Sequence, residues 1–157
     1  MELNKVVDFT LLNEAGQPIS ISDFRGKPVV IYFYPKDNTP GCTTQALQYK
    51  ELYGEFQKLG VEIIGISKDG QKSHQKFKRD HDLPFTLLTD NDLNITTQLG
   101  FTGQKKVMKN SILGIIRSSI VIDEEGKLIK IFKGCKSKED AHVVLKFLKN
   151  RLEEEKK

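Results

Sequence analysis

The stretch Pro28–Ser67, PVVIYFYPKDNTPGCTTQALQYKELYGEFQKLGVEIIGIS, decides the fold. It opens with a continuous apolar, β-branched and aromatic run, Pro28–Tyr34, which is typical of a strand covered on both faces. After a loop rich in turn residues, apolar side chains from Cys42 to Leu59 recur at spacings of three and four, which indicates a helix. Val61–Ser67 is expected to form a second buried strand. Because a helix separates the two strands, we expect a parallel pair with a right-handed crossover.

Hairpins are predicted on both sides of this unit. Thr10–Ile21 contains turn residues between two apolar runs, and Ser118–Ile122 and Leu128–Phe132 flank the turn sequence DEEGK. Between the central unit and the second hairpin we expect a helix at Gln71–Asp82, a short strand at Phe85–Leu88, a short helix at Asp90–Gly100 and an irregular segment at Phe101–Ile116. After the second hairpin, Ser137–Asp140 can form a capping box for a last helix. This order predicts an α/β fold, a thioredoxin-like three-layer sandwich with a central mixed sheet and an N-terminal β-hairpin.

Composition limits the classes of protein to consider. The chain has 157 residues, 38% of them hydrophobic, so residues 1–157 suit a single domain. Two cysteines are too few for a disulfide scaffold or a four-cysteine zinc site. The longest apolar run, Val29–Pro35, is far shorter than the roughly 20 residues of a spanning helix, and the N-terminus does not resemble a secretory signal. We therefore expect a cytoplasmic protein that does not contact the membrane.

The net charge of +4 comes mainly from lysines. They alternate with acidic and polar residues, which favours a solubilising surface over a nucleic-acid site. The histidines His74, His81 and His142 lack metal-ligand spacing, so we expect them at exposed or helix-surface positions. The chain also lacks the GxGxxG, P-loop and GxSxG motifs, and neither a metal nor a cofactor is predicted.

Cys42 is the candidate nucleophile. It lies where the Pro/Gly loop meets the first long helix, and unpaired N–H groups and the helix dipole stabilise a thiolate at such a position. The alternative is a small buried apolar side chain, as free cysteines often are. The position after the loop favours access to a ligand over a role in the core.

The spacing of Pro35, Thr39 and Cys42, P-x-x-x-T-x-x-C, resembles the peroxiredoxin active-site loop. The longer string YPKDNTPGCTTQA is similar to the peroxiredoxin Q group, also called bacterioferritin comigratory proteins. The flanking sequences DFTLLNEAGQPISISDFRGKPVVIYFYP, LPFTLLTD and IIRSSIVIDEEGKL also fit, so the resemblance extends over about residues 3–152. It implies a thiol-dependent peroxidase that reduces hydrogen peroxide and organic hydroperoxides.

The resemblance also implies roles for single residues. Cys42 would be the peroxidatic cysteine and become a sulfenic acid, while Thr39 would bind or orient the peroxide. Pro35 would shield the thiolate from water, and the N–H groups of Gly41 and Cys42 would stabilise charge on the peroxide oxygens. From pattern alone Thr39 could equally be a turn or N-cap residue, and Pro35 a strand terminator.

A basic residue completes the implied site. Arg117 interrupts an apolar stretch just before a core strand, where the pattern alone would allow an exposed strand-start residue. By resemblance it would stabilise the Cys42 thiolate and hold the peroxide through its planar guanidinium. Gln45 matches a Glu/Gln position of the family and would orient Arg117.

The sequence does not decide how the Cys42 sulfenic acid is reduced back to the thiol. Many peroxiredoxin Q proteins have a resolving cysteine at the position of Leu47, and the remaining thiol here is Cys135. A symmetric final hairpin places Lys133 opposite Arg117, which puts Cys135 on the same sheet rim as Cys42. Cys135 could resolve the sulfenic acid, or an external thiol could attack it directly in a one-cysteine cycle.

The expected partners are a peroxide and a thioredoxin- or glutaredoxin-type reductant, with the protein as a monomer or weak homodimer. A thiol-disulfide oxidoreductase is the alternative enzyme, although Cys42-Thr43-Thr44-Gln45 holds no second cysteine. A peroxide sensor or a chaperone-like binding protein of the same fold is the non-enzymatic alternative.

Overall fold

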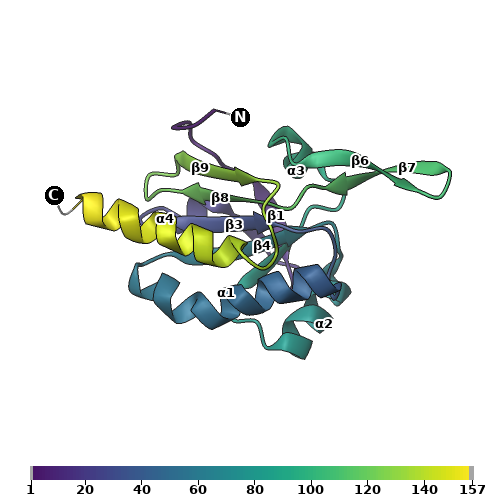
Figure 1. The fold of residues 1–157 in the computed structure, drawn as a ribbon, viewed down its shortest axis with the longest axis horizontal. Helices are drawn as coiled ribbons and strands as arrows, with labels where there is room; N and C mark the ends of the chain where they lie inside the picture. The colour runs from purple at the N-terminus through teal and green to yellow at the C-terminus, as the bar shows by residue number, and fades with distance from the viewer. Residues whose placement is uncertain (1, 156–157) are drawn as a thin grey trace.

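A seven-stranded mixed sheet forms the centre of the protein in a computed structural model that describes residues 2–155 (Figure 1). Its strand order is β2-β1-β5-β4-β3-β8-β9. The strands are β1 (Thr10–Asn13), β2 (Pro18–Ser20), β3 (Val29–Phe33), β4 (Glu62–Ser67), β5 (Thr86–Thr89), β8 (Ser118–Ile122) and β9 (Leu128–Lys133). β3 pairs in parallel with β4, and β4 with β5, as the strand–helix–strand pattern predicts; the other pairs are antiparallel.

Helices cover both faces of this sheet. The elements are η1 (Ile21–Phe24), α1 (Pro40–Lys58), α2 (Gln71–His81), α3 (Asn94–Gln98) and α4 (Asp140–Glu155). Residues of α1, α2 and α4 share one core cluster, and residues of η1 and those flanking α3 belong to the cluster on the opposite face. The prediction of a thioredoxin-like three-layer sandwich with an N-terminal β-hairpin is therefore confirmed.

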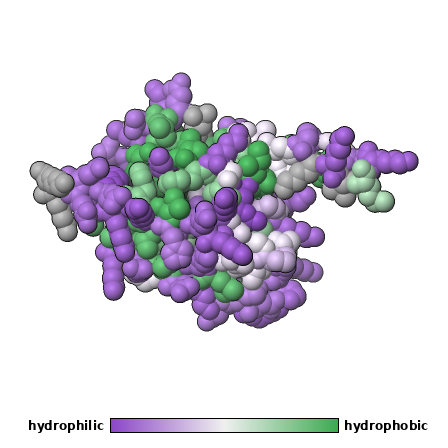
Figure 2. All heavy atoms as spheres, in the orientation of Figure 1, coloured by the Kyte–Doolittle hydropathy of each residue, from purple (hydrophilic) through white to green (hydrophobic). Residues whose placement is uncertain are grey.

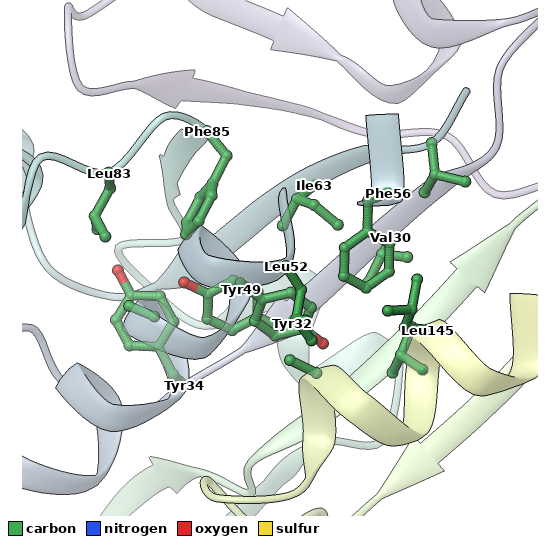
Figure 3. Packing of buried hydrophobic residues seen from close by; sticks show 14 of the residues in the cluster. Val30, Tyr32, Tyr34, Tyr49, Leu52, Phe56, Ile63, Leu83, Phe85 and Leu145 are labelled. Atoms are coloured by element: carbon green, nitrogen blue, oxygen red, sulfur yellow. The ribbon is translucent and has the colours of Figure 1, made fainter. Parts of the chain in front are cut away.

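β3 shows why the central strands are apolar throughout. Successive side chains of a strand point to opposite faces, so Val30 and Tyr32 pack under α1 while Ile31 and Phe33 pack on the other side. All five residues of β3 are buried. In the first cluster, the rings of Tyr32 and Tyr49 stack with centroids 4.6 Å apart (Figure 3). This packing fixes α1, and with it the Cys42 end of the helix, against the sheet.

The segment expected to be irregular, Phe101–Ile116, forms a second hairpin instead. β6 (Thr102–Val107) pairs with β7 (Asn110–Ile115) as a separate two-stranded sheet that projects from the body (Figure 1). Met108 in its turn adopts a positive φ of 60° and is 95% exposed. The exposed β7 residues Ile112 and Leu113 do not alternate with polar residues, so this segment lacks the period-two pattern that identifies a half-buried strand.

The last hairpin differs by one residue from the predicted register. The structure pairs Ser118 with Lys133, so Arg117 is not opposite Lys133. The cause is a register irregularity between Val121 and Ile122, which inserts one extra residue on the partner strand. Cys135 still lies beside Arg117, because its N–H donates to the Arg117 carbonyl oxygen at 2.8 Å.

Hydrophilic side chains dominate much of the face drawn in Figure 2, and the projecting hairpin carries both hydrophilic and hydrophobic side chains. The exposed residues include Lys106, Lys109, Lys146 and Lys149. Within residues 2–155, no helix is both long and apolar enough to span a bilayer.

Candidate active site

Cys42 is the third residue of α1, which begins at Pro40 directly after the loop from β3. The first intrahelical bond runs from the Thr43 N–H to the Thr39 carbonyl oxygen at 2.8 Å, so the N–H groups of Gly41 and Cys42 precede it and face out of the helix end. Cys42 is only 1% exposed and belongs to the core cluster under α1. The expectation that Cys42 would not lie in the core is therefore wrong, because Cys42 is buried in the core at the helix terminus.

Arg117 contacts the sulfur of Cys42. Its Nη2 lies 3.5 Å from Cys42 Sγ, and its Nη1 donates to Gln45 Oε1 at 2.6 Å. The guanidinium therefore uses two different nitrogens to hold two residues of α1. These contacts bring together Cys42, Arg117 and Gln45, as the sequence predicts.

Gly41 allows this close approach. A Cβ placed on Gly41 would lie 3.1 Å from Arg117 Nη2, which is tighter than an ordinary van der Waals contact. A side chain at this position would therefore push the guanidinium away from the helix terminus. The glycine acts here through its size and not through unusual backbone angles.

Thr39 and Pro35 lie in the loop before the helix and make their contacts there. Thr39 is the backbone N-cap of α1, but its hydroxyl makes no capping bond and instead donates to the Lys36 carbonyl oxygen at 2.9 Å. With its proton used in this way, the hydroxyl oxygen remains an acceptor. Pro35 is half-buried and lines a cavity of about 220 Å³ with Lys36 and residues of β7.

Asp140 extends the site to α4. Its carboxylate accepts hydrogen bonds from Gln45 Nε2 at 2.9 Å, Tyr49 Oη at 2.6 Å and Ser119 Oγ, and the residue is 1% exposed. The predicted capping box with Ser137 is wrong, because the carboxylate turns into the core to these three donors. Burial, followed by the charge of Asp140, raises the pKa of Tyr49 well above its usual value, so the phenol keeps its proton.

Cys135 contacts this network through Ser119. Its Sγ is 3.9 Å from Ser119 Oγ, and it lines a cavity of about 280 Å³ between β9 and α4. Burial, followed by the negative charge of Asp140, raises the pKa of the Cys135 thiol to about 12. Cys42 and Cys135 do not form a disulfide bond with each other.

A buried pair that the sequence did not predict supports the loop. Asp37 accepts hydrogen bonds from Tyr34 Oη at 2.6 Å and Ser73 Oγ at 2.8 Å, and its Oδ2 lies 2.7 Å from His74 Nδ1. His74 Nε2 is 3.1 Å from the Leu88 carbonyl oxygen. The expectation that His74 is exposed is therefore wrong, since it is fully buried and ties the loop to α2 and β5.

The residues that the sequence missed act through tertiary contacts. Asp140 is the first residue of an amphipathic helix, and Asp37 lies in a polar loop, so each has the local pattern of an exposed residue. Neither pattern carries a signal for burial. Within residues 2–155, no group of three or more histidine, cysteine, aspartate or glutamate side chains is arranged to hold a metal.

Comparison with known proteins identifies the family. The model of the AhpC/TSA family matches residues 3–131. Peroxiredoxin Bcp from Bacillus subtilis is 40% identical over 149 residues, which cover 95% of this chain and 95% of that protein. Peroxiredoxin Bcp from Escherichia coli K12 is 39% identical over 141 residues, 90% of each chain. The chain belongs to the AhpC/TSA family and is a peroxiredoxin, an oxidoreductase that reduces peroxides with thiols.

Solved structures agree with this assignment. The bacterioferritin comigratory protein of Xanthomonas campestris superposes with a TM-score of 0.85 at 34% identity over 91% of each chain. A PrxQ mutant from Xylella fastidiosa gives a TM-score of 0.90 at 27% identity over 97% of this chain and 98% of that one. These similarities confirm the predicted fold and the predicted resemblance.

Proposed function

We propose that Cys42 is the peroxidatic cysteine of this enzyme. Its thiolate attacks the terminal oxygen of a peroxide ROOH, an S–O bond forms, and the O–O bond breaks. The sulfur is oxidised by two electrons to a sulfenic acid, and the leaving alkoxide or hydroxide takes up a proton to give alcohol or water. The observation that supports this role most strongly is the contact of Arg117 Nη2 with Cys42 Sγ at the N-terminus of α1.

Arg117 and the helix terminus supply the electrostatic part of the reaction. The guanidinium is a permanent cation with several donors, so it stabilises the thiolate before the attack and the peroxide oxygens during it. The N–H groups of Gly41 and Cys42 add two further donors at the same place. Gln45 supports the chemistry indirectly, because it holds Nη1 of Arg117.

Thr39 is assigned a role in binding the peroxide, and Pro35 a role in limiting water around it. Since the Thr39 hydroxyl donates to Lys36, its free lone pairs can accept the hydrogen of the incoming peroxide. Pro35 lacks an N–H and presents an apolar ring at the start of the loop, which limits water near the site. The bacterioferritin comigratory protein of Xanthomonas campestris has alkyl peroxide reduction activity, which supports organic hydroperoxides as substrates beside hydrogen peroxide.

An external thiol regenerates Cys42 in this proposal. One thiol attacks the sulfenic acid, releases water and forms a mixed disulfide; a second thiol attacks that disulfide and returns Cys42 as the thiol. Leu47 stands at the family's resolving position, and the raised pKa of Cys135 keeps it protonated and weakly nucleophilic. We therefore favour a one-cysteine cycle served by a thioredoxin- or glutaredoxin-type reductant in the cytoplasm, with the protein a monomer or weak homodimer.

Turnover with defined variants tests this function. Purified protein is supplied with hydrogen peroxide and a thioredoxin or glutaredoxin reducing system, and consumption of peroxide is followed. We expect turnover by the wild type and by Cys135→Ser, and none by Cys42→Ser. Equal rates for wild type and Cys42→Ser would overturn the assignment of Cys42, whereas loss of turnover in Cys135→Ser would show that Cys135 resolves the sulfenic acid.

A further inference from the structure

We propose that Asp140 is a positioning residue that fixes the orientation of the Gln45 side-chain amide and thereby holds Arg117 against Cys42. This inference rests on the proposed role of Arg117 at the peroxidatic cysteine. It adds a residue from α4, far away in the sequence, to the control of the site.

The argument begins with the donors and acceptors available. A guanidinium can only donate hydrogen bonds, and a carboxylate can only accept them. Gln45 lies between the two, with Oε1 at 2.6 Å from Arg117 Nη1 and Nε2 at 2.9 Å from Asp140 Oδ2. A glutamine has one oxygen and one NH₂ group at its end, so a single orientation of the amide satisfies both neighbours.

Asp140 is itself held on several sides. Tyr49 donates to the same oxygen that accepts from Gln45, and Ser119 donates to the other oxygen. The residue opens α4, where the positive end of the helix favours a carboxylate. Because the carboxylate is buried and has three donors, it offers Gln45 an acceptor at a fixed point.

The chemistry at position 45 follows from this arrangement. A residue there must present a donor to Asp140 and an acceptor to Arg117, which glutamine does and glutamate does not. Glutamate at 45 would place two carboxylates at the distance of the present hydrogen bond, in a buried site. If Asp140 became asparagine, its NH₂ group could donate to such a glutamate, and the glutamate would still accept from Arg117.

A double-mutant cycle at positions 45 and 140 tests whether the donor and acceptor at these two positions must match. The readout is the second-order rate constant of Cys42 oxidation by hydrogen peroxide. The midpoint of urea unfolding measures the stability of each variant. We expect Asp140→Ala and Gln45→Glu each to slow oxidation about tenfold or more. Asp140→Asn should stay within threefold of wild type, because its amide oxygen can still accept from Gln45. The double variant Gln45→Glu with Asp140→Asn should recover to within threefold of wild type.

Two control variants distinguish positioning by Asp140 from general loosening of the structure and from failure of the proposed role of Arg117. Tyr49→Phe removes another hydrogen bond to Asp140 and should lower the midpoint while the rate stays within twofold; a loss of rate equal to that of Asp140→Ala would show general loosening and overturn the inference. Arg117→Met, measured in parallel, tests the proposed function itself. If Arg117→Met is slow but the double variant is no faster than Gln45→Glu, the role of Asp140 is refuted; a normal rate in Arg117→Met would refute the role of Arg117 instead.

Discussion

Substitution of Arg117 probes the electrostatics of the site most sharply. A full positive charge 3.5 Å from the sulfur would attract a thiolate by about 5 kcal/mol at an effective dielectric constant of about 20. The guanidinium charge is spread over three nitrogens and the side chain is half-buried, so we take about 3 kcal/mol for the charge as a whole. Since 1.36 kcal/mol corresponds to a factor of ten, and the attraction is lost both for the thiolate and for the charge that moves onto the peroxide oxygens, Arg117→Met should slow oxidation of Cys42 by up to about two powers of ten.

Arg117→Lys distinguishes charge from geometry. Lysine keeps the charge but has one ammonium group, which cannot replace Nη1 at Gln45 and Nη2 at Cys42 together. We expect the rate of Cys42 oxidation in Arg117→Lys to be about tenfold below that of wild type, and so between the rates of wild type and Arg117→Met. The chain has no tryptophan, so the rate is best measured by competition with another peroxidase for limiting hydrogen peroxide. A rate for Arg117→Lys equal to that of wild type, or one for Arg117→Met within threefold of it, would refute this account.

Three further predictions concern the surroundings of the site. Gly41→Ala should fold normally yet slow oxidation of Cys42 about tenfold, because its Cβ would meet Arg117 Nη2 at 3.1 Å; an unchanged rate contradicts the close-approach argument. The rate of Cys135 alkylation by iodoacetamide should keep rising with pH toward about 12, and a plateau near pH 9 would contradict the raised pKa. Asp140→Asn should increase this rate at pH 8, because removing the negative charge lowers the pKa of the Cys135 thiol. His74→Leu should lower the free energy of unfolding by about 3–5 kcal/mol in urea titrations, because it leaves the buried Asp37 carboxylate without one partner, and a loss below about 1 kcal/mol would argue against the pair as a support of the loop.

The sequence predicted the central part of the fold because the signals there are local. β3 is a continuous apolar run, β4 is a mostly apolar segment, and the helix between them has its apolar residues at helical spacing, so periodicity and turn residues were sufficient. The hairpin at Thr102–Ile115 was not predicted, because its strands project from the body and do not need an alternating apolar face. The one-residue register error at Lys133 arose from an irregularity that the turn sequence does not encode.

At the site, the sequence predicted Cys42, Arg117 and Gln45 through the motif and the resemblance to peroxiredoxins. It failed for Asp140 and His74, whose burial depends on contacts between segments that are distant along the chain. A polar residue at a helix start or on an amphipathic helix is exposed in most proteins, so the local pattern points the wrong way. Only the assembled fold shows that His74 contacts Asp37 of the loop and that Asp140 contacts Gln45, which in turn accepts from Arg117.

The central claim is that Cys42 takes the peroxide oxygen. It is tested most directly by intact-mass and peptide analysis of the reduced protein after one equivalent of hydrogen peroxide, with free thiols alkylated in denaturant afterwards. We predict a gain of one oxygen located at Cys42, an alkylated Cys135, and no gain at residue 42 in Cys42→Ser. Oxygen located on Cys135 with Cys42 fully alkylated would contradict the account.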